Sequence, residues 1–467
     1  MILNQINRKV CIVGSGFCGF AAYKKLKEEN IELLVVEGGD IETPTSQKDQ
    51  SFYKIFQNPI IKFRENLNLK SRLDPSFNDR KYTLGGSSEC WTGWIKPFEQ
   101  STYKNSFNTN PNQIWGDLNL EKYNNEVLNL LNSPISEFDP NIISKELNYS
   151  LPKLSNGLSY TTYAWASEPL RIKNFWKERL IRDNNFNKIN KYNDVIVGYK
   201  LLDYKKNKNK IETLIFRNKN NDEIIVKADY FIFCMGGIEN ARFAKRIFKN
   251  SNIKNKDKEI IGNFQEHPHF YNIAYFNKGA KSLPNLLTKG EIISDKSNYF
   301  SKNGRVKIAI KAWDGPGTPK VTFDIYKTRG KTLFYSFQNI IRSNLKRTLL
   351  PNSDYWITMR CEQTPNNNSK LKFTSNKNYL NWNVKDSDFI FYSNYLKKLG
   401  SFLIANGYAE EFNLSYNSHN NFAIPPQIYG GCHHMGTVPF LQNQALINDK
   451  FRLSIFDNSF IVGSSSF

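Results

Sequence analysis

The histidines are the side chains of this chain best suited to proton transfer. There are five of them: His267, His269, His419, His433 and His434. An imidazole titrates near neutral pH, so it can take a proton from a hydroxyl group. His433 and His434 stand together in CHHMGT, and an isolated pair of this kind is more often structural than catalytic. A metal site is disfavoured, because adjacent side chains diverge and no cluster of Cys, His or Asp completes a coordination sphere.

A glycine-rich segment near the N-terminus has the spacing of a dinucleotide site. Apolar runs at Val10–Val13 and Ile31–Val36 flank a helical pattern at Phe20–Glu29, and the second run ends at Glu37. This order predicts a βαβ unit. Within it stand three glycines with G-x-G-x-x-G spacing, Gly14, Gly16 and Gly19. The pattern by itself does not separate FAD from NAD.

Each position of that motif has a physical task. Gly14 would allow a tight turn, Gly16 the approach of backbone amides to a pyrophosphate, and Gly19 close packing of helix on strand. Glu37 would hold ribose hydroxyls.

Two further glycine pairs follow. LGGSSECWTGW places Gly85 and Gly86 before Ser87 and Ser88, a turn that would let backbone approach a flat or anionic group. The alternative is a tight turn beside a tryptophan-rich core. In VKADYFIFCMGGIENARFAKRIF, a predicted strand at 230–234 enters Gly236 and a helix that begins near position 238.

With these motifs in place, the chain resembles the glucose–methanol–choline family of FAD oxidoreductases, in the branch of pyranose oxidase and the fructose and gluconate dehydrogenases. The segments that carry the resemblance keep the family's order along nearly the whole chain: VCIVGSGFCG, LGGSSECWTGW, WGDLNLEKYNNEV, FIFCMGGIENARF, IGNFQEHPHF, CEQTPNNNSKLKFT, YLNWNVKDSDF, GGCHHMGTVPF and INDKFRLSIFDNSFIVGSSS.

The resemblance implies FAD and assigns residues to it. The three motif glycines would receive the pyrophosphate and Glu37 the adenosine ribose, while Val195 would lie near the adenine. The flavin side would pass Gly85, Gly86, Ser87 and Ser88, with Gly236 at the second glycine pair and Gly463 and Ser464 near the pyrophosphate and ribityl chain. Where pyranose oxidase joins a histidine covalently to the flavin, this chain has Cys90, so we expect non-covalent FAD.

The resemblance also assigns the chemistry. His433, three residues before Gly436, aligns with the family's base, which takes the hydroxyl proton while hydride moves to flavin N5, and His434 is the second candidate. His267 and His269 would border the pocket. The family continues past this point to a second catalytic Asn or His and a final helix. The sequence given ends at Phe467, so we expect a shortened sequence, an enzyme without that helix, or an inactive relative.

The fold class expected is α/β with an α+β second domain. Residues 1–100, 188–264 and 424–467 would build a Rossmann-like FAD-binding domain from discontinuous segments. Residues 101–187 and 265–423 would supply a substrate domain with an antiparallel sheet. Strand patterns in the latter cover 306–313, 355–363, 370–374 and 380–384, and a helical pattern covers 387–407.

The composition of the chain limits the kinds of binding partner and the cellular location that we expect. Lys and Arg number 64 against 43 Asp and Glu, a net charge of +21, but these residues are scattered, so we do not expect nucleic acid binding. Six cysteines without a CxxC pair, and no secretory signal or 18-residue apolar run, favour a cytoplasmic protein without a transmembrane segment.

The function expected is oxidation of a CH–OH group of a sugar, sugar acid or polyol. A dehydrogenase using a quinone or carrier protein is slightly favoured over an oxidase using oxygen. A catalytically impaired flavin- or sugar-binding relative and an NAD-dependent dehydrogenase remain alternatives.

Overall fold

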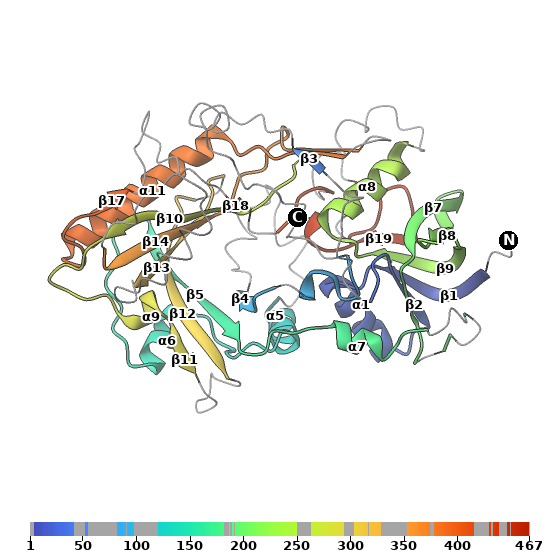
Figure 1. The fold of residues 1–467 in the computed structure, drawn as a ribbon, viewed down its shortest axis with the longest axis horizontal. Coiled ribbons are helices and arrows are strands. Elements are labelled where there is room, and N and C mark those ends of the chain that lie inside the picture. Colours follow the sequence, from blue (N-terminus) through green and yellow to red (C-terminus); the bar gives the residue numbers. More distant parts are fainter. Residues whose placement is uncertain are drawn as a thin grey trace.

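The computed structural model describes most of the chain. The described residues are 4–41, 52–54, 82–89, 91–97, 120–181, 186, 189–190, 192–249, 263–293, 303–315, 317–327, 353–373, 378–414, 429–430, 433–438, 446–448 and 450–466. Their strands form two large sheets at opposite ends of the molecule and one small sheet (Figure 1). Within these residues, no helix has the length and apolar character needed to cross a membrane.

The sheet nearer the N-terminus has seven strands. They are β1 (Asn4–Val13), β2 (Leu33–Glu37), β6 (Val195–Val197), β7 (Lys200–Asn207), β8 (Lys210–Arg217), β9 (Glu223–Phe233) and β19 (Ser459–Ile461). The order is β6-β2-β1-β9-β8-β7, with β19 also paired to β9. Pairing is parallel from β6 to β9 and for β19, while β8 and β7 are antiparallel additions.

Side-chain alternation on β1 and β2 divides the core around this sheet. Val10 and Ile12 pack on the face covered by Phe20 of α1 and Trp176 of α7. Cys11 and its alternating neighbours pack on the opposite face, with α8. Two buried faces explain why the second half of β1, from Val10 to Val13, and most of β2 are continuous apolar runs. The predicted βαβ unit is confirmed, although β1 begins at Asn4 rather than Val10.

The second large sheet has nine strands. They are β4 (Trp94–Ile95), β5 (Leu158–Ala166), β10 (Pro268–Phe276), β11 (Glu291–Ile293), β12 (Gly304–Ala312), β13 (Val321–Lys327), β14 (Tyr355–Cys361), β17 (Asn413–Leu414) and β18 (Tyr429–Gly430). The order is β17-β10-β14-β13-β12-β5-β4, with β11 on β12 and β18 on β10. All of its pairings are antiparallel.

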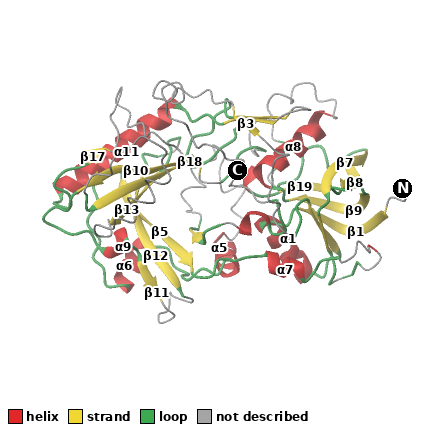
Figure 2. Ribbon diagram, viewed as in Figure 1, coloured by secondary structure: helices red, strands yellow, loops and turns green. Residues whose placement is uncertain are grey.

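The helices are arranged around these sheets (Figure 2). They are α1 (Phe17–Glu28), α5 (Leu120–Leu130), α6 (Pro140–Glu146), α7 (Lys173–Lys177), α8 (Gly236–Lys249), α9 (Asn285–Thr288) and α11 (Asp386–Ala405), with 3-10 turns η2 (Gly86–Glu89) and η5 (Ser464–Ser466). The predicted strands at 306–313 and 355–363 and the helix at 387–407 are confirmed as β12, β14 and α11.

The patterns at 370–374 and 380–384 have a different outcome. Strands do form, as β15 (Lys370–Phe373) and β16 (Asn378–Asn381), but they lie in a separate three-stranded sheet with β3 (Phe52–Lys54). The predicted strands are therefore confirmed, and they pair antiparallel with each other outside the nine-stranded sheet. A strand pattern reports burial and alternation, and it does not specify the partner strand. The segment boundaries of the two domains stay a prediction; β4 and β18, from the outer segments, pair into the nine-stranded sheet.

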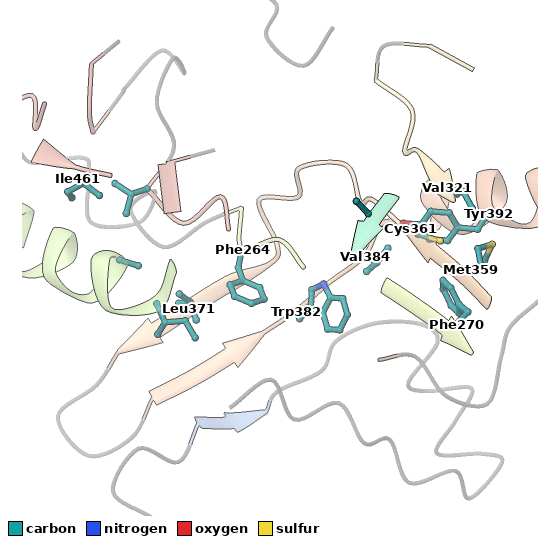
Figure 3. Packing of buried hydrophobic residues seen from close by; sticks show 14 of the residues in the cluster. Phe264, Phe270, Val321, Met359, Cys361, Leu371, Trp382, Val384, Tyr392 and Ile461 are labelled. Carbon is teal, nitrogen blue, oxygen red and sulfur yellow. The ribbon is translucent and has the colours of Figure 1, made fainter. Parts of the chain in front are cut away.

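Buried apolar side chains join the two ends of the molecule. Figure 3 shows Phe264 and Trp382 between Leu371, on the small sheet, and Phe270, on β10. Phe264 and Phe270 are 0% and 1% exposed, so both ends of the short connection between them are anchored. That connection carries His267 and His269, and the packing therefore positions two of the histidines.

Candidate active site

Of the three glycines in the motif after β1, two are packed so tightly that a side chain would clash, and the third has free space at its Cβ position. Gly14 has φ +102°, and a Cβ there would lie 2.6 Å from the carbonyl oxygen of Cys234. A Cβ on Gly19 would lie 2.0 Å from the Gly14 oxygen. At Gly16, the N-cap of α1, no heavy atom of the described residues lies within 4 Å of the Cβ position. Open space thus adjoins a helix N-terminus, an arrangement that favours an anion such as a phosphate.

Glu37 lies at the end of β2, against this motif. Its Oε2 accepts hydrogen bonds from the backbone N–H and the hydroxyl of Ser15, at 2.9 and 2.7 Å, and its Oε1 accepts from the N–H of Gly39 at 2.7 Å. Burial raises the pKa of Glu37, and these hydrogen bonds oppose the rise. These contacts fix the Glu37 carboxylate at the end of β2, beside the Gly14–Gly19 motif.

The Gly85–Gly86 turn lies directly over the motif. Both glycines have positive φ, and a Cβ on Gly86 would lie 3.5 Å from the Cα of Gly16. The N–H of Gly85 donates to the Ser15 hydroxyl at 2.9 Å. Ser88 is buried and its hydroxyl donates to the Gly85 carbonyl, whereas Ser87 is exposed. Two glycine turns 70 residues apart in the chain therefore approach each other at Gly16.

Val195 has a different environment. Its side chain is fully buried, its N–H donates to the Arg179 carbonyl, and its own carbonyl accepts from Ile181. Both backbone groups of Val195 are thus used inside the protein. A contact with a ligand in this region would come from its neighbours.

The last described segment joins the motif to the histidines. Gly463 has φ +114°, and a Cβ there would lie 3.1 Å from the Cys18 sulfur on α1. The hydroxyl of Ser464 donates to the His434 carbonyl at 2.7 Å, and the Ser464 carbonyl accepts from the N–H of Gly436. Gly236, at the start of α8, has φ +76° and no heavy atom of the described residues within 4 Å of its Cβ position.

His433 and His434 point into different environments. His433 is exposed, and its ring lies 5.1 Å from that of His267, at 88°. His434 is 7% exposed, with its Nε2 3.5 Å from Oε2 of Glu266. Protein surrounds the His433 ring closely although solvent reaches it. This desolvation, and then repulsion from His267, lowers the pKa of His433 to about 4. At neutral pH the ring is therefore uncharged and can accept a proton.

Glu266 was missed by the sequence reasoning. It is 1% exposed, and its Oε1 accepts the N–H of His267 at 2.9 Å and that of His433 at 2.8 Å. Gln265 and Met435 pair backbone to backbone beside it, which aligns the two segments. One buried carboxylate thus fixes the backbone of both histidine segments. The only signal in the sequence is an acid directly before HPH.

The histidines at 267 and 269 lie beside cationic side chains. Desolvation lowers the pKa of His267 to about 4, and repulsion from Lys96 and Arg360 adds to the effect. Desolvation also lowers the pKa of His269, to about 2, with repulsion from His267 and Arg360 as further causes. Both rings are neutral at pH 7 and border the space near His433.

Two residues discussed in the sequence analysis are not among the described residues. Cys90 and His419 lie outside the described residues, so the expectation of non-covalent attachment stays a prediction. Within the described part of the chain, no group of three His, Cys, Asp or Glu is arranged to hold a metal ion.

Comparison with known proteins places the fold. No known family profile and no curated protein matches the sequence. Pyridoxine 4-oxidase from Mesorbium loti matches with a TM-score of 0.53 and 16% identity, over 98% of this chain and 94% of that chain. Formate oxidase from Aspergillus oryzae RIB40, in a structure concerned with modification of its FAD, matches with a TM-score of 0.56 and 14% identity, over 99% and 94%. At such identities the likeness establishes the fold, and it confirms the predicted mixed α/β class.

Proposed function

We propose that this protein is an FAD-dependent oxidoreductase that oxidises a CH–OH group of a sugar, sugar acid or polyol, with His433 as the base. The observation that carries the proposal is the open position at Gly16. It faces the Gly85–Gly86 turn and is joined through α1, Gly463 and Ser464 to the segment that bears His433. The likeness to two oxidases, one of them described with FAD, supports the same reading.

The residues of the chain fit the proposed cofactor. The first turn of α1 and the open space at Gly16 suit a pyrophosphate, and Glu37, held by Ser15 beside that space, would meet the ribose. The second open glycine, Gly236, begins α8, and Asn240 of this helix donates to the hydroxyl of Ser465, next to Ser464. When bound, FAD supplies the ring that accepts a hydride from the substrate carbon. Cys90, in place of a histidine, favours non-covalent attachment.

His433 would take the substrate hydroxyl proton on a ring nitrogen. Its low pKa keeps that nitrogen unprotonated at neutral pH, which a base requires. His434 is buried between Phe264, with ring centroids 5.6 Å apart, and Glu266. That burial fits a positioning role for His434 better than contact with substrate.

The electron acceptor is a separate question. Both structural relatives are named as oxidases, while the resemblance of the sequence to the fructose and gluconate dehydrogenases favours a quinone or carrier protein. We retain the dehydrogenase as the proposal. Reoxidation of the reduced protein by a soluble quinone at least tenfold faster than by air-saturated buffer would support it.

The test of the function uses the purified protein. We expect a yellow protein that releases intact FAD on acid precipitation and bleaches anaerobically with some member of a panel of sugars, sugar acids and polyols. Bound FAD without bleaching across the panel would favour the impaired binding relative. A colourless protein that does not take up added FAD would overturn the proposal, and nicotinamide reduction without flavin would indicate the NAD-dependent alternative.

A further inference from the structure

Three charged side chains on neighbouring strands of the nine-stranded sheet form a group with excess positive charge. Asp324 on β13 is fully buried and lies between Lys307 of β12 and Arg360 of β14. Its Oδ1 is 3.4 Å from the Lys307 Nζ, and its Oδ2 pairs with the Arg360 guanidinium. Among the described residues, Asp324 is the only carboxylate paired with either cation. We call these three residues the cationic triad.

The two cations differ in exposure. Lys307 is 1% exposed, donates to the Ile325 carbonyl at 3.2 Å and lies 4.1 Å from the Tyr326 ring centroid. Arg360 is 21% exposed and lies 4.5 Å from the Trp94 ring centroid. Lys307 is therefore enclosed, while the Arg360 side chain keeps some exposure to solvent.

Burying two cations against one carboxylate is costly, because one positive charge lacks a counter-charge. Desolvation lowers the pKa of Lys307 to about 7, and repulsion from Arg360 and then Arg305 adds to the effect. A guanidinium keeps its proton under these conditions. The side chain able to hold an incoming anion is thus Arg360, whose planar fork matches a carboxylate.

The triad lies beside the histidines. Arg360 is paired across the sheet with His269 on β10. Two residues earlier in the chain is His267, whose ring is 5.1 Å from His433. Arg360 also contributes to lowering the pKa of His267. An anionic group held by Arg360 would therefore lie on the same side of the sheet as the base.

We propose that the substrate of this protein carries a carboxylate that Arg360 binds, so that a sugar acid is preferred over a neutral sugar or polyol. This proposal rests on the proposed function and selects among its substrate classes. A carboxylate fits better than a phosphate, because the triad carries at most one positive charge in excess and the planar fork of Arg360 matches a carboxylate. Asp324 and Lys307 act as positioning residues that orient the guanidinium.

The first experiment compares two probes that share a carbon chain. Gluconate ends in a carboxylate where sorbitol ends in a hydroxymethyl group. In anaerobic stopped-flow reduction of the holoenzyme, we expect gluconate to be favoured at least tenfold in the ratio of reduction rate to dissociation constant. Arg360→Gln should lower the preference for gluconate over sorbitol by about tenfold to a hundredfold, the range for a charge-assisted hydrogen bond.

The variant has built-in controls. Arg360→Gln leaves Lys307 as the counter-charge of Asp324, so the buried carboxylate stays paired and the fold should persist. Arg217→Gln makes the same charge change in the other sheet, at an arginine paired with Glu223, and should leave the preference intact. Arg360→Lys retains the charge without the fork and should fall between wild type and Arg360→Gln.

A second experiment measures anion binding without turnover. Calorimetric titration with acetate and with inorganic phosphate should show acetate binding to the wild type and its loss in Arg360→Gln. No binding of acetate or gluconate to the wild type, stronger binding of phosphate, or undiminished binding in Arg360→Gln would each overturn the carboxylate proposal. If acetate binds through Arg360 but the protein takes up no FAD, the proposed function fails and the anion site stands.

Discussion

Glu266 offers the sharpest test of how this fold holds its histidines. Its Oε1 accepts the backbone N–H groups of His267 and His433, from two segments that are far apart in the chain. Glu266→Ala removes the acceptor from both amides. An unpaired buried donor costs about 1–3 kcal/mol, and because the two amides are only partly buried we take about 1–2 kcal/mol each. We therefore expect a loss of about 2–4 kcal/mol.

Glu266→Gln separates the charge from the hydrogen bonds. The amide oxygen has the same reach and can accept both N–H groups, but neutral bonds are about half as strong as those to a carboxylate. We expect a loss of about 1 kcal/mol for this variant. The matched control is Glu212→Gln, which removes an exposed partner of Lys227 and should change stability by less than about 0.5 kcal/mol.

The assay is urea unfolding of each variant, together with anaerobic flavin reduction. Glu266→Ala should also displace the His433 backbone. Flavin reduction in this variant should therefore be about tenfold to a hundredfold slower, since small misplacements of a reacting group have effects of this size. Glu266→Gln should retain most of the rate. Wild-type stability and wild-type reduction in Glu266→Ala together would refute the assignment.

The remaining predictions concern the base and the glycine motif. His433→Ala should keep FAD bound and slow reduction by about a hundredfold to ten-thousandfold, the usual range for a general base; anaerobic bleaching at wild-type speed would remove His433 from that role. Because the pKa of His433 is lowered to about 4, its neutral form persists on acidification. The reduction rate should stay flat from about pH 8 to pH 6 and fall only below about pH 5, so a rate–pH profile with its midpoint at 6.5 or higher would contradict this environment. Gly16→Val should abolish FAD binding, measured by absorbance, and change the urea midpoint of the apoprotein little, because a Cβ there meets no described atom within 4 Å. Gly19→Ala should instead lower that midpoint, because its Cβ would lie 2.0 Å from the Gly14 oxygen.

The sequence was informative where local pattern and burial agree. The βαβ unit could be predicted because β1 and β2 are buried on both faces, which makes their apolar runs continuous. The start of β1 could not, since Asn4 to Lys9 contains only one apolar residue, Ile6, and the strand is extended there by pairing with β9. Helix α1 likewise begins at Phe17, inside the glycine motif, rather than at Phe20.

The groups that surround the histidines could not be predicted in the same way. Glu266 gains its role from the pairing of Gln265 with Met435, 170 positions later in the chain, and no local pattern encodes that contact. Lys307, Asp324 and Arg360 meet only because three antiparallel strands adopt one register. A shift of one residue in any of them would turn a charged side chain to the other face.

The same dependence on register explains why two adjacent histidines can have different tasks. Gln265 and Met435 pair through their backbones, which holds the residues just before Met435 beside Glu266. Successive side chains of an extended segment point to opposite sides. His434 is thereby buried against Glu266 and Phe264, while His433 is left exposed beside His267. With the 265–435 pairing kept, one residue inserted between 434 and 435 should occupy the buried position and bring His434 to the exposed position beside His267. We therefore expect this insertion combined with His434→Ala to lose flavin reduction as fully as His433→Ala, and retained reduction would show that the pairing does not decide which histidine acts.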